Sequence, residues 1–145
     1  LQEAGTLAAD VGDAVGLAYA RELLGLVAAR LGDEEEATAH WAEAQLRYEQ
    51  LHDDDGQARC LLHRATVLMA ADPARARELL TDSVALRGDR PGVGAALAHA
   101  RLAELTRDGR TWERHRQLAR EALAPWQDRL EQPEEVTALL EDLTN

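Results

Sequence analysis

Apolar residues recur along the chain at the spacing of one face of an α-helix. The first such stripe contains Leu17, Ala20, Leu24, Val27 and Leu31, with Leu23 alongside. Intervals of three and four residues place these side chains on one helical face, which we expect to pack in the core. No segment alternates apolar and polar residues with period two over a useful length, so we expect no β-strands. The pattern predicts an all-α fold.

The same spacing returns in every later segment. The apolar sets expected in the core are Ala37, Trp41, Ala44, Tyr48 and Leu51; Ala58, Leu61, Leu62, Ala65 and Leu68; Ala76, Leu79, Leu80, Val84 and Leu86; Val93, Leu97, Ala100 and Ala103; and Trp112, Leu118, Ala122 and Trp126. With the turn signals between them, these sets predict seven helices near 14–31, 34–51, 56–71, 73–87, 92–107, 111–130 and 133–143.

An internal repeat organises these helices into pairs. A triplet that begins with glycine and ends with alanine occurs at Gly16, returns at Gly56 and returns again at Gly94, each time preceded by an acidic residue. Halfway through each unit, Gly or Pro stands beside Asp, at 31–33, 71–73 and 107–109. Gly and Pro break helices and Asp caps the next one, so each unit is predicted to be an αα-hairpin.

The repeat divides the chain into segments within one domain. We expect hairpins at 13–52, 53–88 and 89–130, the end of a preceding helix at 1–12, and a short capping helix at 131–145. The chain is expected to be a fragment of a larger protein, because residues 7–13 resemble the end of one unit and the start of the next.

The first unit resembles a tetratricopeptide repeat. Leu24-Gly25, Gly32-Asp33, Ala37, Trp41 and Ala44 match the spacing of that family. The resemblance implies that stacked αα-hairpins form a right-handed superhelix, in which Gly25 and Ala37 allow close helix approach and Trp41 fills the space between hairpins.

The later units depart from the family pattern. Ala65 and Ala103 replace Gly25, and Leu80 replaces the aromatic residue. The units are also longer than usual, and in this they resemble the C-terminal repeat domains of large bacterial transcriptional regulators and signalling NTPases.

The resemblance further implies that the first helix of each hairpin lines a concave groove. The groove positions are then Tyr19, Glu22, Leu26, Arg30, Arg59, Leu62, Thr66, Met69, Leu97, Glu104 and Arg107. Arg30, Arg59 and Arg107 are candidates for holding a carboxylate of a ligand, because guanidinium offers a bidentate donor. The alternative, that these arginines pair with acids of neighbouring helices, is equally open.

Charge narrows the class of partner. The 145 residues carry a formal charge of −11, with arginine as the only strongly basic residue type. Such a surface repels phosphate backbones, so direct nucleic-acid binding is not expected. No apolar run reaches the roughly 20 residues of a membrane span. Cys60 is the only cysteine, which fits a reducing compartment, and a cytoplasmic location is expected.

Candidate chemistry is sparse. The acidic runs at 33–36 and 53–55 open helices, where capping explains them better than a metal or acid–base role. Cys60 and His63 would share a helix face, but two ligands make a poor zinc site. No nucleophile stands in a catalytic motif and no phosphate loop occurs. We expect no enzymatic activity, cofactor or metal.

Three functions fit these observations. The first is a module that binds a protein or peptide, as the regulatory or sensor arm of a larger bacterial regulator. The second is a homo-oligomerisation module, with Trp112, Trp126 and the last helix forming a homodimer interface. The third is a domain that binds a small-molecule effector.

Overall fold

The computed structural model describes residues 2–106 and 109–126. In this part of the chain, six α-helices follow one another: α1 (Gln2–Arg30), α2 (Glu34–Gln50), α3 (Asp54–Leu68), α4 (Pro73–Arg87), α5 (Val93–Thr106) and α6 (Gly109–Leu123), before a short 3-10 helix at Ala124–Trp126. These residues include no β-strand, which confirms the all-α class. The capping helix expected at 133–143 and the segment 131–145 lie outside the described residues.

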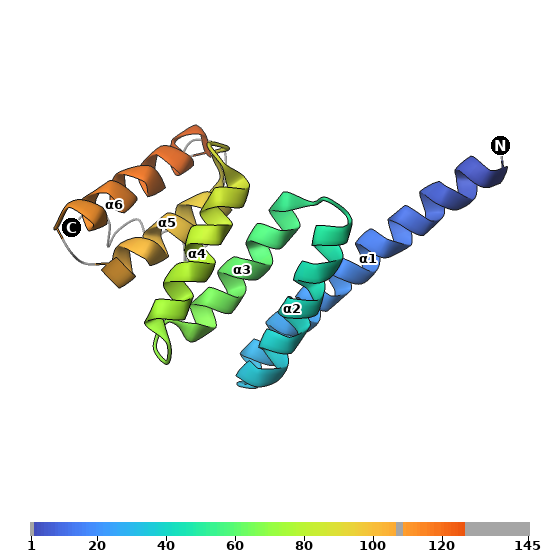
Figure 1. The fold of residues 1–145 in the computed structure, drawn as a ribbon, viewed down its shortest axis with the longest axis horizontal. Coiled ribbons are helices and arrows are strands. Elements are labelled where there is room, and N and C mark those ends of the chain that lie inside the picture. Colours follow the sequence, from blue (N-terminus) through green and yellow to red (C-terminus); the bar gives the residue numbers. More distant parts are fainter. Residues whose placement is uncertain (1, 107–108, 127–145) are drawn as a thin grey trace.

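The helices pack in the order in which they occur. α1 packs on α2, α3 on α4 and α5 on α6, and these three hairpins lie side by side through contacts of α2 with α3 and of α4 with α5 (Figure 1). α3 also contacts α5, so the first helices of neighbouring hairpins approach one another. This arrangement places α1, α3 and α5 along one side of the row of hairpins.

Aspartate residues begin the middle helices, as the sequence predicts. Asp33, Asp53 and Asp72 each accept a hydrogen bond from the backbone N–H three residues later, at 3.0, 3.0 and 3.1 Å. These bonds satisfy N–H groups that have no partner inside the helix. The capping interpretation of Asp33 and Asp53 is therefore confirmed.

Two predicted helix boundaries are wrong. The expected break at residue 12 is absent, because α1 runs without interruption from Gln2 to Arg30. Gly12 costs a helix roughly 1 kcal/mol relative to alanine, which long flanking helical sequence can outweigh. α6 ends at Leu123 instead of near residue 130, since Pro125 removes a backbone donor and disfavours helix at the residue before it. Trp126 therefore does not share a helix with Trp112.

Two main apolar clusters hold the hairpins together. The first joins α1, α2 and α3 through Ala18, Ala28, Ala37, Trp41, Ala44, Tyr48 and Cys60. The second joins α3, α4 and α5 through Leu61, Leu62, Ala65, Ala76, Leu79, Leu80, Ala98 and Leu102. The core sets predicted for the second hairpin and for α2 are largely confirmed.

The predicted core stripe of α1 is wrong. Leu17, Leu24, Val27 and Leu31 are 46–80% exposed, whereas the face that packs on α2 carries Ala18, Gly25 and Ala28 among others. A Cβ atom built on Gly25 would lie 2.3 Å from Nε1 of Trp41, so the small residues on this face allow the indole to enter. The size of Trp41 thus determines which face of α1 is buried.

A candidate binding groove and the buried network beside it

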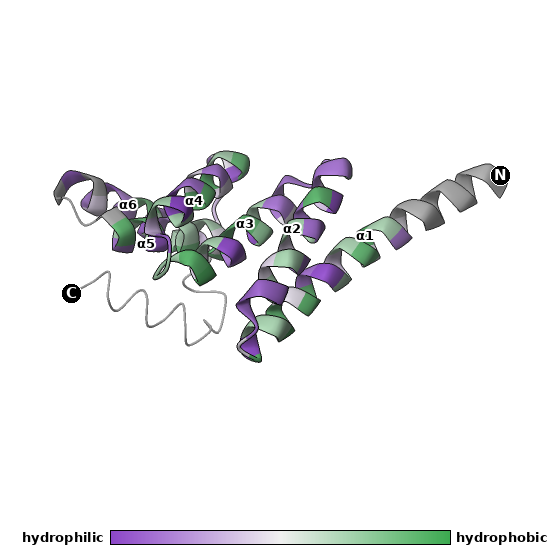
Figure 2. Cartoon of the chain, turned by 60° about the horizontal axis from the view of Figure 1, so that its bottom comes forward, coloured by the Kyte–Doolittle hydropathy of each residue, from purple (hydrophilic) through white to green (hydrophobic). Residues whose placement is uncertain are grey.

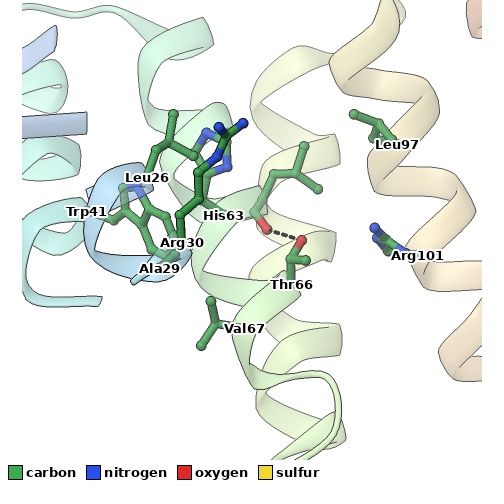
Figure 3. Close-up of a pocket in the computed structure, with 10 residues that line it drawn as sticks. Leu26, Ala29, Arg30, Trp41, His63, Thr66, Val67, Leu97 and Arg101 are labelled. Carbon is green, nitrogen blue, oxygen red and sulfur yellow. Dashed lines mark hydrogen bonds between the residues drawn. The ribbon is translucent and has the colours of Figure 1, made fainter. Parts of the chain in front are cut away.

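A pocket of about 400 Å³ opens on the side of the molecule formed by the first helices. Its lining residues come from all three hairpins: Leu26, Ala29 and Arg30 of α1; Trp41 of α2; Leu62, His63, Thr66 and Val67 of α3; and Leu97 and Arg101 of α5 (Figure 3). Most of these side chains are apolar, and the two arginines stand on helices at opposite ends of the set. The pocket therefore combines an apolar surface with cationic groups on either side.

Two stacked rings occupy the α1 side of this pocket. The rings of Trp41 and His63 are 5.3 Å apart between centroids and inclined by 23°. The Nε1 of Trp41 donates a hydrogen bond of 3.2 Å to the backbone oxygen of Glu22, which fixes the indole against α1. This wall of the pocket is consequently held in place before any ligand arrives.

A buried ionic network lies directly behind the stacked rings. Glu22, only 4% exposed, accepts a hydrogen bond of 2.8 Å from the hydroxyl of Tyr48. Arg59 donates to the same carboxylate from Nε at 3.0 Å and from Nη2 at 3.1 Å, and its Nη2 also donates to the Tyr48 oxygen at 3.3 Å. Nε2 of His63 lies 3.7 Å from the carboxylate, within ion-pair range but beyond a hydrogen bond. The network links the first three helices.

These contacts determine the ionisation of the network. Burial alone would raise the pKa of Glu22, but His63, Arg59 and Tyr48 together lower this pKa to about 2. Burial and the neighbouring carboxylate raise the pKa of the Tyr48 hydroxyl, and hydrogen bonding to Glu22 raises that of Arg59. The network therefore contains a carboxylate, a guanidinium and a neutral phenol at neutral pH.

The structure brings together only part of the predicted groove. Five of its positions line the pocket: Leu26, Arg30, Leu62, Thr66 and Leu97. Their role in binding a ligand remains a prediction.

The other predicted groove positions lie elsewhere. Glu22 and Arg59 are bound to each other, so for Arg59 the alternative of pairing with a neighbouring acid holds. Tyr19 is about half-exposed outside the pocket, Met69 packs against the core between the second and third hairpins, and Glu104 pairs with Arg101 at 3.2 Å. Arg107 lies outside the described residues.

Sequence reasoning missed two kinds of pocket residue. On α3, the residues directly after the predicted positions Leu62 and Thr66, namely His63 and Val67, also line the pocket. The prediction counted a single row of positions along the helix, and a groove two rows wide would have included both. Trp41 was assigned to packing alone, although the indole both packs and lines the pocket. Arg101 lies on α5 one helical turn after Leu97, on the same helix face, so a wider predicted groove would have included it as well.

Outside the pocket, two histidines meet that lie 16 residues apart in the sequence. Nδ1 of His99 and Nδ1 of His115 are 3.2 Å apart, and the rings stack with centroids 5.5 Å apart. Burial, with a smaller contribution from His115, lowers the pKa of His99 to about 4; burial and Arg114 lower that of His115. Both rings are therefore neutral at pH 7, and the N–H of one donates a hydrogen bond to the ring nitrogen of the other.

The thiol of Cys60 is inert, and the described residues form no cluster of metal ligands. Cys60 is fully buried, and burial raises the pKa of its thiol to about 12, which leaves too little thiolate for reaction. Within residues 2–106 and 109–126 no three His, Cys, Asp or Glu side chains converge as metal ligands would. No helix in the same ranges combines the length and the apolar character that crossing a bilayer requires.

Comparison of the chain with protein-family models, with curated proteins and with solved structures finds no match.

Proposed function

We propose that the chain is a helical-repeat interaction module, similar to tetratricopeptide repeats, that binds an extended segment of a protein partner. The observation that carries this proposal is the pocket itself, which is lined by the first helices of three successive hairpins. A ligand filling it would cross α1, α3 and α5 in turn, as an elongated peptide can. Hairpins stacked into a superhelix would extend this surface into a concave groove.

The chemistry of the lining suggests what the peptide carries. Leu26, Leu62 and Leu97 offer an apolar surface from one hairpin to the next. Arg30 stands exposed at the α1 end. A peptide with apolar side chains and a carboxylate near one end fits this arrangement, because guanidinium binds carboxylates in a bidentate manner.

A small-molecule effector is a weaker match. The volume of about 400 Å³ lies within the roughly 300–1,000 Å³ of typical ligand pockets, so volume alone does not distinguish the two ligands. Small-molecule sites also supply several converging polar groups, whereas here His63, Thr66 and the two arginines are spread over three helices. The spread favours a ligand that makes successive contacts.

The assignment to a larger regulator depends on the length of the repeat units. We propose that the module is the regulatory or sensor arm of a larger bacterial protein, because its units of about 40 residues resemble those of such proteins. Peptide binding would then report the presence of the partner to the remaining domains.

A pair of threonines provides a direct test of the groove. Thr66 lines the pocket and Thr81 lies on the exposed surface of α4; both hydroxyls donate to the backbone oxygen four residues earlier, at 2.8 Å. Peptides selected from a random twelve-residue display library on the parent chain would be titrated against Thr66→Trp and Thr81→Trp. Filling the pocket should weaken binding at least about tenfold in Thr66→Trp and leave Thr81→Trp unchanged. Equal affinity for both variants, or no selected peptide, would reject the groove as the binding site.

A further inference from the structure

Helix α1 exposes most of the large apolar side chains that the described surface displays. Six of its residues are 42–54% exposed: Val15, Leu17, Tyr19, Leu23, Leu24 and Val27. Leu31, which directly follows the helix, is 80% exposed. Among the residues whose exposure the structure describes, Leu46 of α2 is the only other large apolar residue that is comparably exposed. Figure 2 shows hydrophobic residues recurring along α1. A contiguous apolar strip of this kind is typical of a surface that binds another protein surface.

The internal repeat shows what kind of element covers this face of a first helix. A shift of 40 residues, the spacing of the first two units, places α1 onto α3. The positions that correspond to Gly16, Ala20, Leu23, Leu24 and Val27 are Gly56, Cys60, His63, Arg64 and Val67.

Each of those α3 residues packs toward α2 of the preceding hairpin. His63 stacks on Trp41, Nη1 of Arg64 donates to Oε1 of Gln45 at 2.6 Å, and the glycine at 56 faces the ring of Tyr48. Cys60 and Val67 belong to the cluster that α2 forms. The equivalent face of α1 therefore has the position of a surface that another antiparallel helix covers.

The sequence of this face is complementary to itself. Leu17, Leu24 and Leu31 are spaced by seven residues, with Ala20 and Val27 between them, which is the a/d pattern of a helix–helix seam. In an antiparallel pair related by a two-fold axis near Leu24, Leu17 of one copy would face Leu31 of the other. The small Ala20 would then face the larger Val27, so the two sides match in volume.

Charge also favours contact at this face. The chain carries −11 overall, which opposes self-association of most of its surface. Between residues 14 and 31, however, the only charged residues are Arg21, Glu22 and Arg30. Arg21 pairs with Glu43 at 3.3 Å and Glu22 is buried with Arg59, so both charges are directed away from the seam.

From these observations we infer that two copies of the chain associate through this face of α1, antiparallel and about a two-fold axis near Leu24. The interface is distinct from the peptide groove, which lies beside Trp41 and α3, and it does not depend on peptide binding. It also differs from the dimer interface predicted at Trp112, whose indole is covered by the guanidinium of Arg116 at 4.3 Å.

Sedimentation equilibrium on the 145-residue chain tests this inference. At micromolar concentration the mass should be twice 15.9 kDa. Leu24→Glu would place two like charges against each other at the axis and should raise the dissociation constant at least about 100-fold. Leu46→Glu is the matched control, because Leu46 is 54% exposed, similar to the 46% of Leu24, but lies on α2; this variant should remain dimeric. Circular dichroism would show that both variants remain helical.

A monomeric parent chain would overturn the inference, as would a dimer that Leu24→Glu leaves intact. Cross-linking tests the orientation. With oxidised glutathione as oxidant, which is reduced as two thiols join in a disulfide, Leu24→Cys should give covalent dimers and Leu46→Cys should not. Cys60 is fully buried and does not compete. In an antiparallel pair, Leu17→Cys alone should not cross-link, so efficient cross-linking of that variant would exclude the proposed orientation.

Discussion

The two junctions between hairpins occupy equivalent places in the repeat but are built from different chemistry. At the first junction, Glu22 of α1 pairs with Arg59 of α3. At the second, the corresponding positions are Leu62 of α3 and Leu97 of α5, which pack in the apolar cluster there. The same helix arrangement is therefore stabilised once by a buried carboxylate paired with a partly exposed guanidinium, and once by leucines.

This difference determines how each junction responds to change. An apolar contact loses stability in proportion to the surface and volume that are removed. A buried carboxylate depends on its partners, because without them the cost of removing the charge from water is not compensated. The first junction is thus specific but vulnerable, whereas the second tolerates a wider range of apolar residues.

The largest expected effect comes from removing one member of the ion pair. Arg59→Leu leaves the buried carboxylate of Glu22 with only the Tyr48 hydroxyl and His63 nearby. It should lower the free energy of unfolding by about 2–4 kcal/mol at pH 7, somewhat less than for a fully buried pair because the Arg59 side chain is 39% exposed. Urea titration followed by circular dichroism measures this loss.

The double variant Glu22→Leu with Arg59→Leu gives the first junction the residues of the second. It should recover stability to within about 1–2 kcal/mol of the parent, because well-packed apolar residues commonly replace a buried ion pair without loss. If the double variant is as unstable as Arg59→Leu, the two junctions are not equivalent in packing and the comparison fails.

Acid should weaken the first junction through Glu22. Its folded pKa of about 2 lies below the unfolded value of roughly 4.3, so its contribution is present above pH 4.3 and is lost as pH falls toward 2. The loss amounts to about 3 kcal/mol, to be measured as the difference in urea stability between the parent and the double leucine variant at each pH. A difference that does not change from pH 5 to pH 3 would exclude an ionised Glu22 as the source.

The third hairpin supplies an internal reference at higher pH. His99 has a folded pKa of about 4, below the unfolded value of roughly 6.5, so its contribution is full above pH 6.5 and falls between 6.5 and 4. This earlier loss should occur equally in the parent and in the double leucine variant. It should shrink in His99→Gln, where only His115, whose pKa burial and Arg114 lower, still contributes.

Two glycines of α1, in the first hairpin, should give smaller effects of opposite sign. In Gly25→Ala the new methyl group would overlap the indole of Trp41, which is 2% exposed and hydrogen-bonded, at a cost of about 1–3 kcal/mol. Gly16→Ala meets nothing within 4 Å and should gain up to about 1 kcal/mol in helix propensity. Urea midpoints for the two variants should therefore shift in opposite directions.

The packing inside the second hairpin explains why an alanine is tolerated at position 65. Ala65 corresponds to Gly25, and it is fully buried against a cluster that contains Leu80 in place of an indole. In a Trp41→Leu background, Gly25→Ala should accordingly lose most of its cost. If Gly25→Ala lowers the stability just as much in the Trp41→Leu background, the indole is not what limits the size of residue 25.

The fold class and the hairpin order could be predicted from the sequence because they depend on local signals. Spacing of apolar residues, aspartate caps and breaker residues act within a few positions, and Asp33, Asp53 and Asp72 begin helices as expected. The buried face of α1 could not be predicted this way. Apolar periodicity favours the face with Leu17 and Leu24, but in the folded chain the neighbouring face of small residues packs against Trp41.

The site could be predicted only in part for the same reason. Leu26, Leu62 and Leu97 follow from helix register once the hairpins are known. The pairing of Glu22 with Arg59 joins residues 37 positions apart, and no short-range pattern distinguishes a groove arginine from a buried one. Likewise His99 and His115 meet only because α5 and α6 pack together.

The smallest expected effect concerns a feature that the two junctions share. Asp33 begins α2 beside the first junction and Asp72 begins α4 beside the second, and their cap bonds are 3.0 and 3.1 Å long at exposed positions. Asp33→Ala and Asp72→Ala should each lower the free energy of unfolding by about 1 kcal/mol, because each leaves one helix N–H without its partner. Asp→Asn at either position, which keeps the accepting oxygen, should cost much less. Urea titration measures these losses of unfolding free energy. If the two alanine variants lose the same amount, the junctions differ only in their buried contacts. A loss at Asp33 several times larger than at Asp72 would show instead that the first hairpin also depends more heavily on its helix starts.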